Sequence, residues 1–228
     1  MTDFDISITS HCNAACPSCK RYPDYGHSHF NPQVKVHHNL NQIHMNFDMF
    51  KKVVENNYDD FSNKTVTYEG ELGDPMTHPK IKDFINFGCD VFKKLKIVTN
   101  GGNRKSSFYK NIGDRYDKLE MVFSIDGLYD DTNQIYRRKV DTEKAKKNML
   151  SFNESKYGRF STSWNFLIFK HNFFEIPEIL HFSKVNSLTI NLRVNCRPKF
   201  ILPYDKINTV INLYEKNKHS KSKLILAN

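Results

Sequence analysis

Short runs rich in Ile, Val, Thr and Phe alternate along the chain with longer segments whose apolar residues recur with helical period. The pattern predicts strands over residues 5–9, 65–69, 96–99, 120–125, 162–169 and 187–194. It predicts helices over residues 47–57, 80–94, 105–116, 142–152, 174–184 and 203–216. Six strand–helix units in succession imply parallel strands joined by right-handed crossovers. The sequence therefore predicts an α/β fold, either a partial (β/α)6 TIM-like barrel or a doubly wound sheet.

Two segments fall outside this alternation. Residues 21–46 are polar and carry five histidines without clear period: His27, His29, His37, His38 and His44. Loops of this length are either functional lids or disordered, and we interpret this one as a lid over a substrate, with a mobile surface loop as the alternative. Residues 217–228 are expected to form a peripheral tail, of which residues 224–226 would dock on the core. A chain of 228 residues fits one domain, residues 1–228.

Composition restricts the classes of protein that the chain can belong to. Its apolar runs are only a few residues long, whereas a membrane-spanning helix needs about 20 residues. The N-terminal residues lack a secretory signal, so we expect a cytoplasmic protein with no membrane partner. The formal charge of +9 leaves a nucleic-acid partner open. Because the basic residues are scattered in short clusters, that reading is not favoured.

Polar residues and glycines follow the first four predicted strands. The segments are 11–19 after the first strand, 70–75 after the second, 100–102 after the third and 124–127 at the end of the fourth. In both candidate architectures the ligand site forms at the carboxyl ends of the strands. Each segment alone reads as ordinary turn chemistry, but together they predict one site.

Three of the five cysteines, Cys12, Cys16 and Cys19, lie within eight residues with Cys-x3-Cys-x2-Cys spacing. Such a cluster is a poor disulfide framework in a reducing compartment, and soft thiolate ligands select zinc or an iron–sulfur cluster. A structural zinc site needs a fourth ligand, which His27 or His29 could supply. Three cysteines without an obvious fourth suit a cubane with one open iron.

The chain resembles the radical S-adenosylmethionine (SAM) superfamily, whose hallmark is this cysteine spacing after the first strand of a partial barrel. Further motifs are similar to those of the family in the same order. They are Gly70-Glu71-Leu72-Gly73-Asp74-Pro75 with His78-Pro79, then Thr99-Asn100-Gly101, then Phe123 to Gly127 with Tyr136-Arg137, and last Asn172 to Ile176. The resemblance covers roughly residues 5–195, and the ordered recurrence makes it specific.

The resemblance implies a 4Fe-4S cluster ligated by the three cysteines, with SAM on the open iron. One electron, from a donor such as a flavodoxin or ferredoxin, would cleave SAM to a 5′-deoxyadenosyl radical that abstracts hydrogen from a substrate. The resemblance further implies oxygen sensitivity. Its SAM-binding residues here would be Gly70, Gly73, Asp74, Asn100, Ser124, Asp126, Arg137 and Asn165, of which Asp74 would meet the ammonium group, and Ser124 and Arg137 the carboxylate.

Two positions depart from the family pattern. Ser18 stands where an aromatic residue often packs on adenine, and Asp74 replaces the usual glutamate of the glycine-rich turn. Cys196 follows the sixth predicted strand, where a thiol could donate a hydrogen atom, although a buried and inert cysteine is the favoured interpretation. No further Cys-x2-Cys group follows the barrel, so we expect a single cluster without an auxiliary-cluster domain.

The sequence leaves the substrate open. A small or medium-sized partner is expected: a peptide, a nucleotide or sugar derivative, or RNA. The rival hypothesis is a zinc-stabilised nucleic-acid-binding module without catalysis, motivated by the positive charge and the Cys/His-rich N-terminal segment. The motifs at the strand ends argue against it, because such a module has no use for them.

Overall fold

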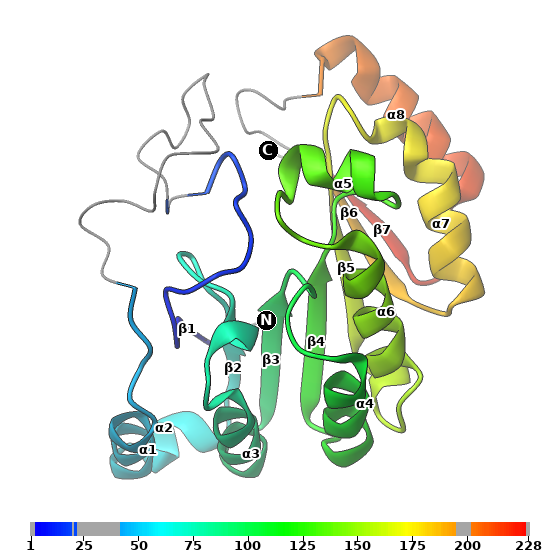
Figure 1. Ribbon diagram of the computed structural model, residues 1–228. Coiled ribbons are helices and arrows are strands. Elements are labelled where there is room, and N and C mark those ends of the chain that lie inside the picture. Colours follow the sequence, from blue (N-terminus) through cyan, green and yellow to red (C-terminus); the bar gives the residue numbers. More distant parts are fainter. Residues whose placement is uncertain (1–2, 20, 22–41, 195–201, 227–228) are drawn as a thin grey trace.

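The computed structural model describes residues 3–19, 21, 42–194 and 202–226 (Figure 1). Within these residues, seven parallel strands form one sheet in the order of the sequence. The strands are β1 (Phe4–Ile6), β2 (Thr65–Tyr68), β3 (Lys94–Thr99), β4 (Leu119–Ser124), β5 (Thr162–Ile168), β6 (Thr189–Val194) and β7 (Ser222–Ile225). The prediction of an α/β fold with an open, parallel, TIM-like sheet is confirmed.

Helices fill the connections between the strands. They are α1 (Phe47–Asn56), α2 (Tyr58–Ser62), α3 (Ile81–Val91), α4 (Ser106–Arg115), α5 (Asp130–Tyr136), α6 (Thr142–Asn153), α7 (Ile176–Val185) and α8 (Tyr204–Asn217). Short 3-10 helices lie at η1 (Pro75–Thr77), η2 (Gly158–Phe160) and η3 (Phe173–Glu175). The six predicted helices are present within a few residues of their predicted ends, whereas α2 and α5 were not predicted, because segments this short carry too few apolar positions to show a period.

The two faces of the sheet differ in chemistry. Along β5, Trp164, Phe166 and Ile168 are fully buried on the face that packs against the helices, and their neighbours Ser163 and Asn165 on the other face are only half-buried. The indole nitrogen of Trp164 donates to a backbone carbonyl at 2.8 Å, so its one polar atom is satisfied in the core. A closed barrel fills its interior with branched apolar side chains. Here the face of β5 opposite Trp164 instead carries the polar side chains of Ser163 and Asn165.

The C-terminal segment corrects one expectation. Residues 222–225 are not peripheral: they form β7, which pairs in parallel with β6, with Ser222 opposite Ile190 and Leu224 packed against the core. Their short period-two pattern was too brief to separate from the surrounding lysines and serines. Among the described residues, no helix is long and apolar enough to cross a membrane.

Several predicted features lie outside the described residues. They are Cys196 and four of the five histidines of the expected lid: His27, His29, His37 and His38. The fifth, His44, is described. It forms an antiparallel bridge with Thr9 just after β1, so the end of segment 21–46 is anchored beside the first strand.

Candidate functional site

The loop after β1 brings three thiols to one place. Cys12, Cys16 and Cys19 line a single cavity of about 200 Å³, which we name the cysteine cavity. It lies at the carboxyl ends of β2, β3 and β4 and is also lined by Ala14, Arg21, Glu69, Gly70, Glu71, Gly73, Asp74, Val98, Thr99, Asn100, Ser124 and Arg137. Among the described residues, no three His, Cys, Asp or Glu side chains converge closely enough to hold one metal ion.

Local hydrogen bonds shape the cysteine loop. The amide of Cys19 donates to the carbonyl of Cys16 at 3.1 Å, and the amide of Ala14 donates to the sulfur of Cys12 at 3.3 Å. The Ala15 amide donates to the carbonyl of Arg138 at 2.9 Å, which ties the loop to the end of α5. Hydrogen bonds within the loop and one to the segment after α5 therefore hold the cysteine loop in place.

The surroundings of Cys12 and Cys16 disfavour the thiolate form of both side chains. Burial raises the pKa of the Cys12 thiol to about 12, and the nearby Asp74 carboxylate adds to the shift. Burial likewise raises the pKa of Cys16, although the guanidinium of Arg137 opposes it. A thiolate becomes favourable in such a place when a metal replaces the proton, so the donor set fits a soft metal centre. Cys89 is buried in α3 and does not line the cavity.

The glycine-rich turn after β2 packs directly against the cysteine loop. A Cβ on Gly73 would lie 2.0 Å from the carbonyl oxygen of Thr9 and 2.9 Å from that of His11. A Cβ on Gly70 would lie 2.0 Å from the carbonyl oxygen of Gly73. The backbone amide of Asp74 donates to the carbonyl of His11 at 2.7 Å. Turn and loop form one unit that admits no side chain at either glycine.

The carboxylate of Asp74 is buried and fully engaged within the protein. One oxygen accepts from the amide of Met76 at 2.9 Å, the other accepts from the amide of Asn100 at 2.8 Å, and the hydroxyl of Thr99 lies 3.0 Å from both. Burial raises the pKa of Asp74, and these hydrogen bonds oppose the shift. Asp74 thus fastens the glycine-rich turn to the end of β3.

Asn100 reaches the cysteine loop. Its side-chain amide donates to the side-chain oxygen of Asn13 at 2.9 Å and lies 3.6 Å from the sulfur of Cys12. Asn103 donates to the same oxygen of Asn13 at 2.7 Å. Asn13 and Asn103 were not singled out in the sequence, because isolated asparagines in turns give no distinguishing signal.

The fourth predicted segment supplies an ion pair behind the cysteines. The Nε of Arg137 donates to the carboxylate of Asp126 at 2.6 Å, and one of its terminal nitrogens lies 3.9 Å from the sulfur of Cys16. The other oxygen of Asp126 accepts from the amide of Leu167 at 2.8 Å. Burial alone would lower the pKa of Arg137, but the charge of Asp126 holds it above its usual value. A permanent cation therefore stands beside Cys16.

Two predicted residues take different places. Ser124 lines the cysteine cavity, whereas Asn165, directly opposite it on β5, is not among the lining residues. The side-chain oxygen of Asn165 accepts from Asn191 on β6 at 3.1 Å, on the face of the sheet opposite Trp164. Arg21 lines the cavity but was not predicted: it is buried and donates to the carbonyl of Ala14 at 3.2 Å. A lone arginine in a polar loop carries no sequence signal.

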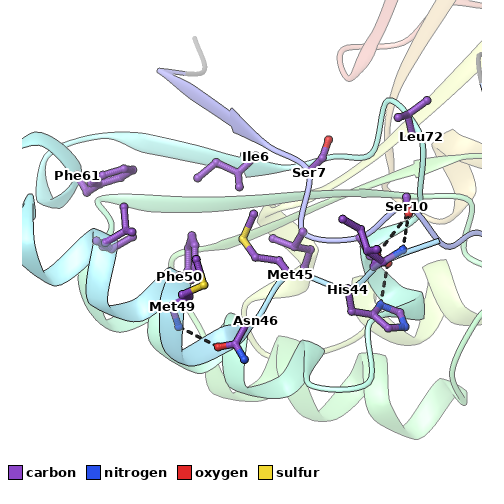
Figure 2. A pocket seen from close by; sticks show the side chains of 15 residues that line it. Ile6, Ser7, Ser10, His44, Met45, Asn46, Met49, Phe50, Phe61 and Leu72 are labelled. Atoms are coloured by element: carbon purple, nitrogen blue, oxygen red, sulfur yellow. Dashed lines mark hydrogen bonds between the residues drawn. The ribbon is translucent and has the colours of Figure 1, made fainter. Parts of the chain in front are cut away.

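A larger cavity lies elsewhere, along β1 (Figure 2). It has a volume of about 680 Å³ between β1, residues 43–46 and α1, and we name it the β1 groove. Its walls are apolar and hold none of the cysteines, so the chemistry belongs to the smaller cavity. The two are neighbours in the chain, since Leu72 lines the groove while Glu71 and Gly73 line the cysteine cavity.

Solved structures with the same fold are radical SAM enzymes. SuiB of Streptococcus suis bound to S-adenosylmethionine superposes with a TM-score of 0.71 at 16% identity, over 99% of this chain and 50% of that one. Native anSMEcpe with bound AdoMet superposes with a TM-score of 0.66 at 13% identity, over 98% of this chain and 62% of that one. The chain has the radical SAM fold. A spore photoproduct lyase mutant gives a TM-score of 0.57 at 12% identity, over 98% and 76%.

One curated relative matches in sequence. The tungsten-containing aldehyde ferredoxin oxidoreductase cofactor-modifying protein of Pyrococcus furiosus is 25% identical over 184 residues, which are 78% of this chain and 46% of the relative. No family model matches the sequence. The chain therefore spans about half the length of this relative and of SuiB.

Proposed function

We propose that this chain is the catalytic domain of a radical SAM enzyme, in which Cys12, Cys16 and Cys19 hold a 4Fe-4S cluster. The placing of the three thiols around one cavity, at the carboxyl ends of the strands in a radical SAM fold, carries the proposal. When bound, the cluster supplies one electron to SAM, whose reductive cleavage gives methionine and a 5′-deoxyadenosyl radical that abstracts hydrogen from the substrate.

Arg137 supports this role through its charge. Its guanidinium lies beside the sulfur of Cys16 and is fixed by Asp126. A positive charge there stabilises the added electron and the thiolate ligands. With Ser124 on the same cavity, Arg137 also offers donors to the carboxylate of SAM.

The glycine-rich turn forms the other wall of the proposed SAM site. Gly70 and Gly73 let the turn pack directly against the cysteine loop, because a Cβ at either position would lie 2.0 Å from a backbone oxygen. Asp74 acts mainly as a positioning residue, because its oxygens are taken by Met76, Thr99 and Asn100. We expect the backbone of the turn, held in place by Asp74, to meet the ammonium group of SAM.

A peptide is the substrate class that we favour. SuiB has been solved bound to the precursor peptide SuiA, and anSMEcpe with a Cp18Cys peptide. Asn165 and Asn191, bonded to each other on β5 and β6, would offer such a substrate polar groups close to Ser124 of the cysteine cavity. We expect an electron donor such as a flavodoxin or ferredoxin to reduce the cluster.

Metal analysis tests the proposal against its rival. The 228-residue chain is reconstituted anaerobically with iron and sulfide, and iron, sulfide and zinc per chain are measured for wild type, Cys16→Ala and Cys89→Ala. We expect wild type and Cys89→Ala to hold a 4Fe-4S cluster and Cys16→Ala to lose it. A protein that rejects iron and retains zinc through these cysteines would instead support a zinc-stabilised module.

A further inference from the structure

The β1 groove is a built cavity whose walls come from three parts of the chain. Figure 2 shows Ile6 of β1 and Phe50 of α1 lining it, together with Met45 from the segment before α1. No lining residue is Asp, Glu, Lys or Arg. Burial lowers the pKa of the one lining histidine, His44, and two neighbouring histidines, His11 and His78, add to the shift, which disfavours its charged form. A charged ligand would find no partner here.

Apolar side chains stand exposed at the mouth of the groove. Met49 and Val53 lie one turn apart on α1 and are 69% and 53% exposed, and Ile43 is 63% exposed. All three line the groove. Scattered exposed apolar residues need no explanation, but a cluster around a cavity marks a binding surface.

The strand that borders the groove has room for a partner. In the part of the chain that the structure describes, β1 ends the strand order and pairs only with β2. An exposed edge strand is a template for another strand. The backbone just after β1 already pairs with another segment in this way. The amide of Ser10 donates to the carbonyl of Ile43 at 3.0 Å, and the amide of Met45 donates to the carbonyl of Ile8 at 2.9 Å, in antiparallel pairing.

We propose that the β1 groove binds an extended, apolar segment of a partner peptide, which pairs with β1 and places alternate side chains in the groove. Strand addition of this kind takes affinity from main-chain hydrogen bonds and specificity from pockets for every second side chain. Leu72 lines the groove and lies between Glu71 and Gly73, which line the cysteine cavity, so a peptide bound in the groove would lie close to that cavity. The inference rests on the proposed function in taking this peptide to be the substrate.

Fluorescence anisotropy with a labelled probe tests the proposal in the full chain, reconstituted with iron and sulfide. The probe is a short peptide of alternating valine and threonine, and its control is the same peptide with alternate amides N-methylated, which cannot pair with a strand. We expect saturable binding of the first probe only. Equal binding of both, or of neither, would overturn the proposal.

Two matched variants locate the binding. Val53→Asp places a carboxylate at the groove, where its desolvation has no compensation, and should weaken probe binding by about tenfold or more. Val185→Asp makes the same change at the end of α7, where the residue is 67% exposed, and should leave binding unchanged. Circular dichroism confirms that both are folded. Equal binding by Val53→Asp and wild type would refute the location.

Sedimentation separates a second copy of this chain from a peptide. A wild-type dimer that Val53→Asp converts to a monomer would show that the groove is an interface between copies, which contradicts the proposal. The binding assay does not depend on SAM cleavage. A protein that cleaves SAM without binding the probe would refute the groove alone, and one that binds the probe without cleaving SAM would refute the proposed chemistry alone.

Discussion

Replacing Asp74 with asparagine tests whether its carboxylate fastens the glycine-rich turn to β3. In Asp74→Asn one oxygen becomes an NH2 group, which must face the amide of either Met76 or Asn100. That amide then loses its acceptor and meets another donor in a buried place. The hydroxyl of Thr99, within 3.0 Å of both oxygens, can turn to the oxygen that remains.

The size of the effect follows from these contacts. Losing a hydrogen bond to a charged group costs about 1.5–3 kcal/mol, and an unsatisfied buried N–H costs about 1–3 kcal/mol. Because burial raises the pKa of Asp74, its charged form carries a desolvation cost, and removing the charge offsets part of the lost hydrogen-bond energy. We expect a net loss of about 2–4 kcal/mol in the free energy of unfolding.

Urea denaturation of the metal-free, reduced protein measures this loss by linear extrapolation. Asp141→Asn is the matched control. Asp141 is an exposed N-cap of α6 that accepts from the amide of Lys144 at 2.9 Å, and asparagine caps helices equally well. The control should change stability by less than about 0.5 kcal/mol. If Asp74→Asn is no more destabilising than the control, the buried hydrogen bonds of Asp74 do not hold in solution.

Three further predictions concern other residues. Gly73→Ala should destabilise the protein by at least about 2 kcal/mol in the same assay, because its Cβ would meet backbone rather than a flexible side chain. A smaller loss of stability than in Gly102→Ala would contradict this prediction. Arg137→Gln should make the reduction potential of the reconstituted cluster more negative, as followed by electron paramagnetic resonance during a redox titration, since a cation beside Cys16 is lost; an unchanged potential would refute that role. Burial lowers the pKa of His171 from 6.5 to about 4, so between these pH values only the unfolded chain binds a proton at this side chain. The free energy of unfolding of wild type should therefore fall relative to that of His171→Phe as the pH is lowered from 6.5 to 4. A constant difference across that range would show that His171 titrates normally.

The strands and the long helices could be predicted because each has a clear period and a buried face. Phe166 and Ile168 alternate with half-buried residues along β5, as the sequence indicates. The edge strand β7 was missed, because its four residues carry lysine and serine on a half-exposed edge, where burial imposes no strong pattern. Helix α5 was missed for a similar reason: only Ile135 and Tyr136 are apolar or aromatic in its seven residues.

The sequence predicts which segments meet at the site, but not the hydrogen-bond partners of the residues within it. Glycines and cysteines at successive strand ends mark one edge of a parallel sheet, and the structure brings them to the cysteine cavity. Which groups Asp74 and Asp126 bind depends on backbone amides and on an arginine eleven positions along the chain from Asp126, and no sequence pattern records these contacts. The β1 groove had no sequence signal either, since its walls come from three separate segments: the first predicted strand, the end of segment 21–46 and the first predicted helix.

The production of 5′-deoxyadenosine tests the central claim most directly. Protein reconstituted anaerobically is reduced with dithionite in the presence of SAM, and the nucleoside is quantified by liquid chromatography for wild type, Cys16→Ala and Cys89→Ala. The account predicts 5′-deoxyadenosine from wild type and Cys89→Ala and none above background from Cys16→Ala. Wild type that forms no more of it than Cys16→Ala would contradict the assignment of a radical SAM activity to this chain.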